Sequence, residues 1–105
     1  MTGVSLIVLY PHPLDVSQFE LDYQEHLVLL HEKNQIPPDT KPYTLTKFLP
    51  TPLGPAPFYQ MFTLPFPSMD ALQQTLASPA MQIVAADAVR ISSGGAPQVL
   101  VGTAN

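Results

Sequence analysis

The chain has 105 residues, a length that suits one domain spanning residues 1–105. Charged residues make up only 11% of the chain, against about 25% in ordinary globular domains, and the net charge is -4 with four dispersed basic residues. A nucleic-acid site needs clustered Lys and Arg, so this composition excludes that class of partner. The absence of cysteine excludes disulfides, thiolate nucleophiles and Cys-ligated metals.

The first apolar segment, residues 4–10, is rich in β-forming residues and predicts a strand. It has neither the basic flank nor the small-residue cleavage site of a signal peptide, and no apolar run is long enough to cross a bilayer. We therefore expect a cytoplasmic protein that has no membrane partner.

A helix is predicted from residue 16 to about residue 33. Two overlapping capping boxes mark its beginning, Asp15 with Gln18 and Ser17 with Glu20. Large apolar residues then recur at helical spacing, which predicts one buried stripe: Phe19, Tyr23, Leu27 and Leu30.

The rest of the chain alternates strands and helices between its prolines, which avoid the interiors of the segments. Strands are predicted at residues 43–49, 58–64 and 98–102, and a proline-rich loop at residues 50–57 joins the first two. Helices are predicted after Ser68 and after Ser78, which both have the character of N-caps. This order is typical of an α+β, ferredoxin-like fold, in which helices cover one face of a four-stranded antiparallel sheet.

The predicted strands are apolar on both faces. In the first strand Val8 and Leu9 lie on opposite faces, and in the third strand Phe62 and Met61 do so. Helices of a single copy cover only one of these faces. We therefore expect a homodimer in which the two sheets face each other and enclose a cavity.

His26 is the strongest candidate for chemistry. It lies three residues after Tyr23 and four before Leu30, so it belongs to the face that contains the buried stripe. Asp22 precedes it by one helical turn, and a carboxylate beside an imidazole orients the ring for general acid–base catalysis. The alternative is a buried structural histidine that is tied to Asp22.

The other polar groups have weaker signals. Tyrosines on apolar segments could orient a ligand in the cavity or simply pack in the core, and the candidates are Tyr10, Tyr23 and Tyr59. His12 and His31 are expected to be structural, and Asp87 with Arg90 to form a surface pair. The spacing of the histidines matches no metal motif, and no phosphate-binding loop is present. No cofactor is predicted.

Several segments together resemble the EthD family of dimeric α+β barrels, named for ethyl tert-butyl ether degradation. The resemblance covers nearly the whole chain and rests on Tyr10-Pro11, on Phe19-x-x-Asp22-Tyr23-x-x-His26-Leu27, on Phe66-x-Ser68-x-x-Ala71-Leu72, on Ser78-Pro79 with Asp87, and on the final segment 99–102. One departure is Val28, where the family usually has proline, and another is the proline-rich loop at 50–57.

The resemblance implies a ferredoxin-like fold, a homodimer, and a hydrophobic pocket between the sheet and the helices. For this protein we therefore expect a catabolic or biosynthetic function. The expected chemistry is cofactor-free proton transfer of the isomerase, cyclase or dehydratase type on a small apolar or aromatic substrate. His26 would move the proton, Asp22 would orient it, and a tyrosine would hold a substrate oxygen. The alternatives are a non-catalytic small-molecule binding protein and a haem-handling protein or cofactor-free monooxygenase. Fold alone does not decide among these.

Overall fold

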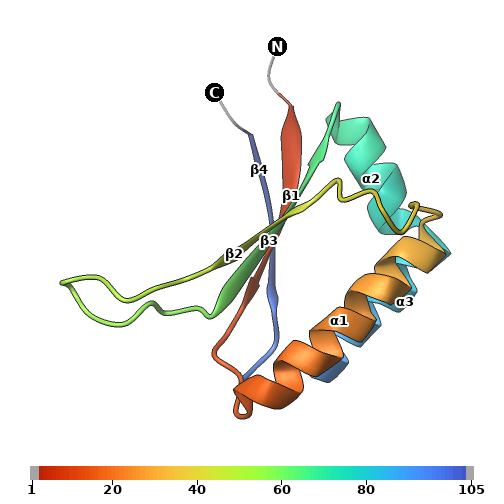
Figure 1. The fold of residues 1–105 in the computed structure, drawn as a ribbon. Helices are drawn as coiled ribbons and strands as arrows, with labels where there is room; N and C mark the ends of the chain where they lie inside the picture. Colours follow the sequence, from red (N-terminus) through yellow and green to blue (C-terminus); the bar gives the residue numbers. More distant parts are fainter. Residues whose placement is uncertain (1–2, 104–105) are drawn as a thin grey trace.

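The computed structural model describes residues 3–103 and has an α+β architecture (Figure 1). Its elements follow in the order β1 (Val4–Tyr10), α1 (Val16–Lys33), β2 (Thr44–Lys47), β3 (Gln60–Phe66), α2 (Met69–Ala77), α3 (Pro79–Ile91) and β4 (Gln98–Thr103).

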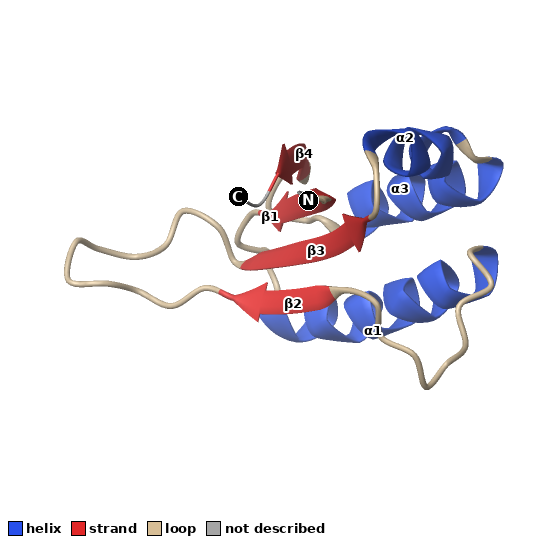
Figure 2. Cartoon of the chain, turned by 90° about the horizontal axis from the view of Figure 1, so that it is seen from above, coloured by secondary structure: helices blue, strands red, loops and turns tan. Residues whose placement is uncertain are grey.

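The four strands form one antiparallel sheet in the order β2-β3-β1-β4. The helices lie on one side of this sheet, with α1 beside α3, as Figures 1 and 2 show. This is the ferredoxin-like arrangement, so the fold class predicted from the sequence is confirmed.

The strand bounds differ from expectation at β2 and β3. β2 is shorter than the predicted 43–49, and β3 lies two residues later than the predicted 58–64, so that it includes Pro65. Proline cannot donate a ladder hydrogen bond and is tolerated at the edge of a sheet. The pairing of β2 with β3 ends at Thr44↔Thr63, so β3 is itself an edge on that side where Pro65 lies.

The core lies between the sheet and the helices. β1 and β3 direct alternate side chains toward the helices, and the buried stripe of α1 faces them, although Leu27, an expected member of that stripe, is only partly buried. The buried stripe comprises Phe19, Tyr23, His26 and Leu30. α2 adds Leu72, one of the most deeply buried side chains of the described residues. Asp15 caps α1 through a hydrogen bond from the backbone N–H of Gln18 (3.1 Å).

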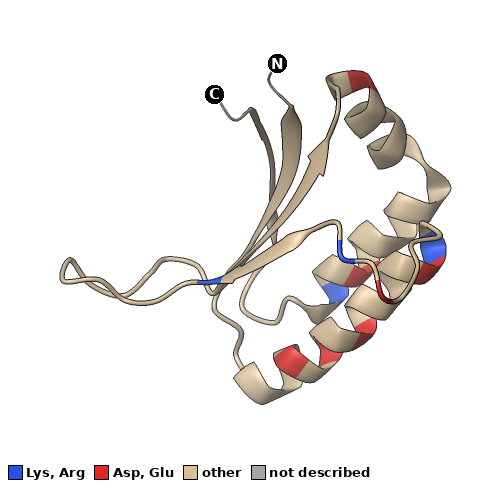
Figure 3. Cartoon of the chain, turned by 45° about the horizontal axis from the view of Figure 1, so that its top comes forward, with Lys and Arg blue, Asp and Glu red and all other residues tan. Residues whose placement is uncertain are grey.

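The opposite face of the sheet has no helix over it in the part of the chain that the structure describes. Ile7, Leu9, Met61 and Leu100 lie on this outer face, and β1, β3 and β4 contain no charged residue. Figure 3 shows that the charges gather on the helices and the neighbouring loops, with Lys47 at the end of β2 as an exception. No helix among residues 3–103 is long and apolar enough to cross a membrane.

Candidate functional site

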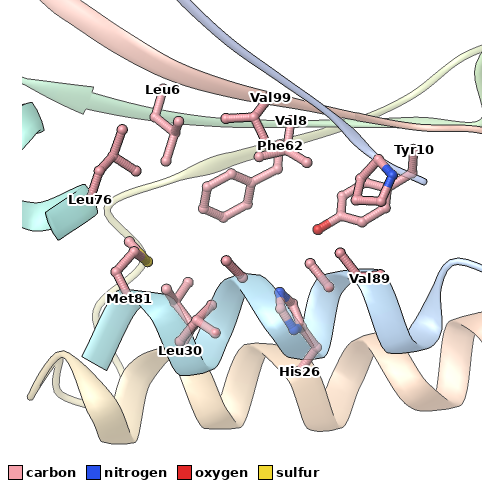
Figure 4. A pocket seen from close by; sticks show the side chains of 14 residues that line it. Leu6, Val8, Tyr10, His26, Leu30, Phe62, Leu76, Met81, Val89 and Val99 are labelled. Carbon is pink, nitrogen blue, oxygen red and sulfur yellow. The ribbon is translucent and has the colours of Figure 1, made fainter. Parts of the chain in front are cut away.

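A cavity of about 170 Å³ lies between the sheet and the helices. Most of its lining is aliphatic or aromatic, and two side chains bring polar atoms to it, His26 from α1 and Tyr10 from β1 (Figure 4). The apolar lining includes Leu6, Val8, Leu30, Phe62, Met81 and Val99. An apolar cavity with a few convergent polar groups is the usual form of a small-molecule site.

His26 reaches the cavity from the helix side, where α1 packs against α3. Its Nδ1 lies 2.9 Å from Oδ2 of Asp87 on α3, 61 residues away in the sequence. The other carboxylate oxygen, Oδ1, accepts a hydrogen bond of 2.8 Å from Nε of Arg90. An ionised carboxylate only accepts hydrogen bonds, so Nδ1 of His26 donates and Nε2 is left with its lone pair.

The electrostatic environment keeps this imidazole neutral. Burial lowers the pKa of His26 below its ordinary value and outweighs the opposing effect of the Asp87 carboxylate. Burial acts in the opposite direction on Asp87, but hydrogen bonds from Arg90 and His26 outweigh it and lower the pKa of that carboxyl group. At neutral pH the pair is therefore an aspartate that orients a neutral histidine, which is the state that a general base requires.

Tyr10 faces the same cavity from the sheet. Its side chain is almost fully buried, and Figure 4 shows the hydroxyl oxygen pointing into the cavity on the side where His26 lies. Burial raises the pKa of Tyr10 to about 12. The hydroxyl therefore stays protonated and can donate a hydrogen bond to a ligand oxygen.

The expected pairing of His26 with Asp22 is wrong. Although the two residues are one turn apart on α1, the ring of His26 turns toward α3, where Asp87 meets it. Asp22 instead accepts a hydrogen bond of 2.9 Å from Nε2 of Gln18.

Of the other two candidate tyrosines, neither lines the cavity. Tyr23 is buried behind Tyr10, with the two ring centroids 5.4 Å apart, and burial raises its pKa well above the ordinary range. Tyr59 immediately precedes β3, and its hydroxyl points to α1, where it donates to Glu20. The structure thus brings Tyr10 and His26 together at the cavity and places Tyr23 and Tyr59 outside its lining.

The remaining histidines have protein partners away from the cavity. Nε2 of His31 lies 2.8 Å from the hydroxyl of Tyr43, and Nε2 of His12 lies 2.7 Å from the carbonyl oxygen of Ala56. Residues 3–103 contain no group of three or more His, Asp or Glu side chains that could hold a metal ion.

The lowered pKa of His26 leads to a testable titration. We expect the NMR titration midpoint of this imidazole to lie below its ordinary value of about 6.5, because burial disfavours the charged ring. Folding stability linked to His26 should be complete above about pH 6.5 and decrease as the pH falls through the folded-state pKa, since the unfolded chain binds the proton more readily. His26→Gln should remove this part of the pH dependence. A midpoint at or above the ordinary value would contradict the neutral state.

No protein-family model matches the sequence, and no curated protein matches it. Solved structures do match. An EthD family protein from Bacillus halodurans C-125 is 25% identical, with a TM-score of 0.77 over 95% of this chain and 96% of that one.

Two further structures are less similar in sequence. A dimeric ferredoxin-like protein of unknown function from Jannaschia sp. CCS1 is 14% identical, with a TM-score of 0.67 over 97% of this chain and 98% of that one. Hydroxynitrile lyase from Passiflora edulis is 17% identical, with a TM-score of 0.71 over 98% of this chain and 94% of that one. At these identities the likeness shows the fold alone. The resemblance to the EthD family, together with the ferredoxin-like α+β fold of dimeric proteins, is confirmed.

Proposed function

We propose that the protein transfers a proton on a small apolar or aromatic compound that carries a carbonyl group, using His26 as the base and no cofactor. One observation carries the proposal: a neutral, carboxylate-oriented histidine borders a cavity whose other polar group is a protonated tyrosine. This pair of groups suits abstraction of a proton from the carbon next to a carbonyl.

The reaction consists of the removal of a proton from the substrate and its return. Nε2 of His26 takes the proton, and the electron pair of the broken C–H bond moves into the carbonyl group to form an enolate. The Tyr10 hydroxyl donates a hydrogen bond to the enolate oxygen, and Asp87 stabilises the imidazolium that forms. His26 then returns the proton to the same carbon, which gives exchange, or, where a C=C bond is conjugated with the enolate, to the far end of that bond, which gives an isomer.

The cavity limits the size of the substrate. Its volume of about 170 Å³ is close to that of apolar cavities of about 150 Å³ that bind benzene. Compounds with one small ring or a short branched chain therefore fit, whereas a haem does not. A haem-dependent reaction is not supported by these dimensions. The fold itself carries enzymatic chemistry in the hydroxynitrile lyase of similar structure.

We also propose that the chain forms a homodimer through the outer face of its sheet. The structures of similar fold include proteins described as dimeric, and the outer face of this sheet is apolar and uncharged on β1, β3 and β4. Monomers rarely expose an apolar surface of more than a few hundred Å². Sedimentation equilibrium at micromolar concentration should give the mass of two chains, and a single-chain mass would contradict the dimer.

Hydrogen–deuterium exchange into a small carbonyl compound tests the catalytic proposal. We expect the protein to accelerate exchange at the carbon beside the carbonyl of at least one of phenylacetaldehyde, acetophenone and cyclohexanone in D₂O, followed by proton NMR. His26→Gln should remove about 10²- to 10⁴-fold of that acceleration, which is the usual contribution of a general base. His31→Gln is the matched control, because His31 lies outside the cavity and forms its hydrogen bond with Tyr43, and it should retain the rate.

Binding without exchange would identify the alternative function. If the same compounds shift the NMR signals of His26 and Tyr10 but none exchanges faster than in buffer, the cavity belongs to a non-catalytic binding protein. Mass spectrometry of the copurified ligand would then identify what it holds.

A further inference from the structure

An uncharged arm projects from one end of the sheet. Residues 48–59 join β2 to β3 and extend beyond the strands in Figures 1 and 2. The arm closes in a tight turn, because Thr51 and Gly54 exchange two backbone hydrogen bonds of 2.9 Å each. At its tip the side chain of Leu53 is 99% exposed, and Leu49 nearer the base is 75% exposed.

The base of the arm is fixed to the body of the protein. Lys47 and Tyr59, on the two sides of the base, both donate to the carboxylate of Glu20 on α1. His12 adds the hydrogen bond of 2.7 Å to Ala56 inside the arm. These contacts fix the orientation of the arm relative to the body of the protein. The two leucines of the arm, Leu49 and Leu53, do not pack against the core of this chain.

The cavity opens where the sheet ends at β4. Val99 and Val101 pair with Val8 and Leu6 of β1, so they lie on the helix-facing side of the sheet. Both are nevertheless exposed, Val99 by 59% and Val101 by 44%. Val89 of α3, across the opening, is 57% exposed and lines the cavity together with Val99. The mouth of the cavity is thus an apolar surface that this chain leaves uncovered among its described residues.

The strand register places the arm and the mouth at the same end of the sheet. Gln60, at the base of the arm, pairs with Tyr10 of β1, and Gln98, at the start of β4, pairs with the adjacent Leu9. β2 and β4 are the two edges of the sheet. When two such sheets stack on their outer faces about a two-fold axis parallel to the strands, the β2 edge of each lies against the β4 edge of the other. Each arm then lies next to the mouth of the partner's cavity.

We propose that the arm of one protomer closes the cavity of its partner, with Leu53 packed against Val89 and Val99 of the partner subunit. This inference rests on the proposed homodimer. A second copy is the occupant that the surfaces favour, because the arm and β4 are both apolar and free of charge. The two-fold arrangement also uses both arms and both mouths and leaves neither uncovered. The cavity would then be completed only in the dimer.

Disulfide trapping tests this contact in a chain that has no cysteine of its own. In the double variant Leu53→Cys/Val99→Cys, mild oxidation should produce a covalent dimer on a non-reducing gel. The double variant Leu14→Cys/Val99→Cys is the matched control, because Leu14 is also highly exposed but lies outside the arm. Neither this control nor Leu53→Cys alone should cross-link to a comparable extent.

The outcomes separate the arm from the other proposals. Sedimentation as a dimer without preferential 53–99 cross-linking overturns the arm contact and leaves the dimer intact. Cross-linking of Leu53→Cys alone at the same rate also overturns it, because the tips would then meet each other. Sedimentation as a single chain overturns both the dimer and the arm contact, whereas the proton-transfer proposal is judged separately by deuterium exchange.

A second measurement does not depend on cysteine chemistry. Leu53→Asp should raise the Kd of the dimer about tenfold or more, because it places a charge in an apolar contact on both sides of the two-fold axis. Leu14→Asp, at a residue that is 85% exposed, should change it less than twofold. Equal effects of the two substitutions would overturn the proposal.

Discussion

Asp87→Asn is expected to reduce the proton-transfer rate by about 10²- to 10⁴-fold while the protein stays folded. Asp87 accepts the hydrogen bond from Nδ1 of His26, which leaves the lone pair on Nε2. An asparagine amide can instead donate to Nδ1, so the ring proton moves to Nε2 and the base is lost. Deuterium exchange into the small carbonyl compounds measures the rate, and long-range ¹⁵N NMR of His26 reports the tautomer.

Asp22→Asn is the matched control for this substitution. It removes a carboxylate of the same size from α1, and the structure pairs Asp22 with Gln18 rather than with His26. We expect its exchange rate to lie within about twofold of the original protein, since surface changes away from a site have small effects. If the two asparagine variants lost activity equally, Asp87 would not be the residue that orients His26.

Leu72→Ala is expected to lower the free energy of unfolding by about 2–5 kcal/mol. Leu72 is 1% exposed on α2, the helix that packs on β1 and β3, so truncation leaves a cavity that the surrounding elements cannot fill. This is a large share of the roughly 5–15 kcal/mol that stabilises a typical domain. Urea unfolding at one fixed protein concentration measures the loss, because the proposed dimerisation would make stability depend on concentration.

Met69→Ala on the same helix is the control. Met69 is 42% exposed, so its truncation should cost less than about 1 kcal/mol. If Leu72→Ala lowered the free energy of unfolding as little as Met69→Ala, Leu72 would not be packed in the core.

The elements of the fold follow from local signals. The serine and aspartate caps, the prolines between segments and the helical spacing of Phe19, Tyr23, His26 and Leu30 are all properties of neighbouring residues. Helix boundaries and the buried face of α1 could therefore be predicted without tertiary contacts. β3 is an exception, because whether Pro65 can belong to a strand depends on where the neighbouring strand ends.

The position of Asp87 in the sequence indicates a need for a second partner besides Arg90. It lies beside the buried stripe of α3, three residues after Val84 and one before Ala88, and is itself half-buried, so its carboxylate borders the core. A charged residue beside such a stripe needs a partner. The predicted pair with Arg90 is present, but it uses only one of the two carboxylate oxygens.

The order of the elements, the ferredoxin-like fold and the inward face of α1 that carries His26 all follow from the amino-acid sequence alone. Those properties arise from periodicity, caps and turns within short stretches of chain. Three features of the site come from packing in three dimensions: Asp87 orients His26, Tyr10 and not Tyr59 shares its cavity, and the mouth opens beside β4. These depend on how α3 packs against α1 and on which strand forms the edge of the sheet. Contacts between residues tens of positions apart leave no periodic trace in the sequence, so their geometry appears only when the helices and the sheet are brought together.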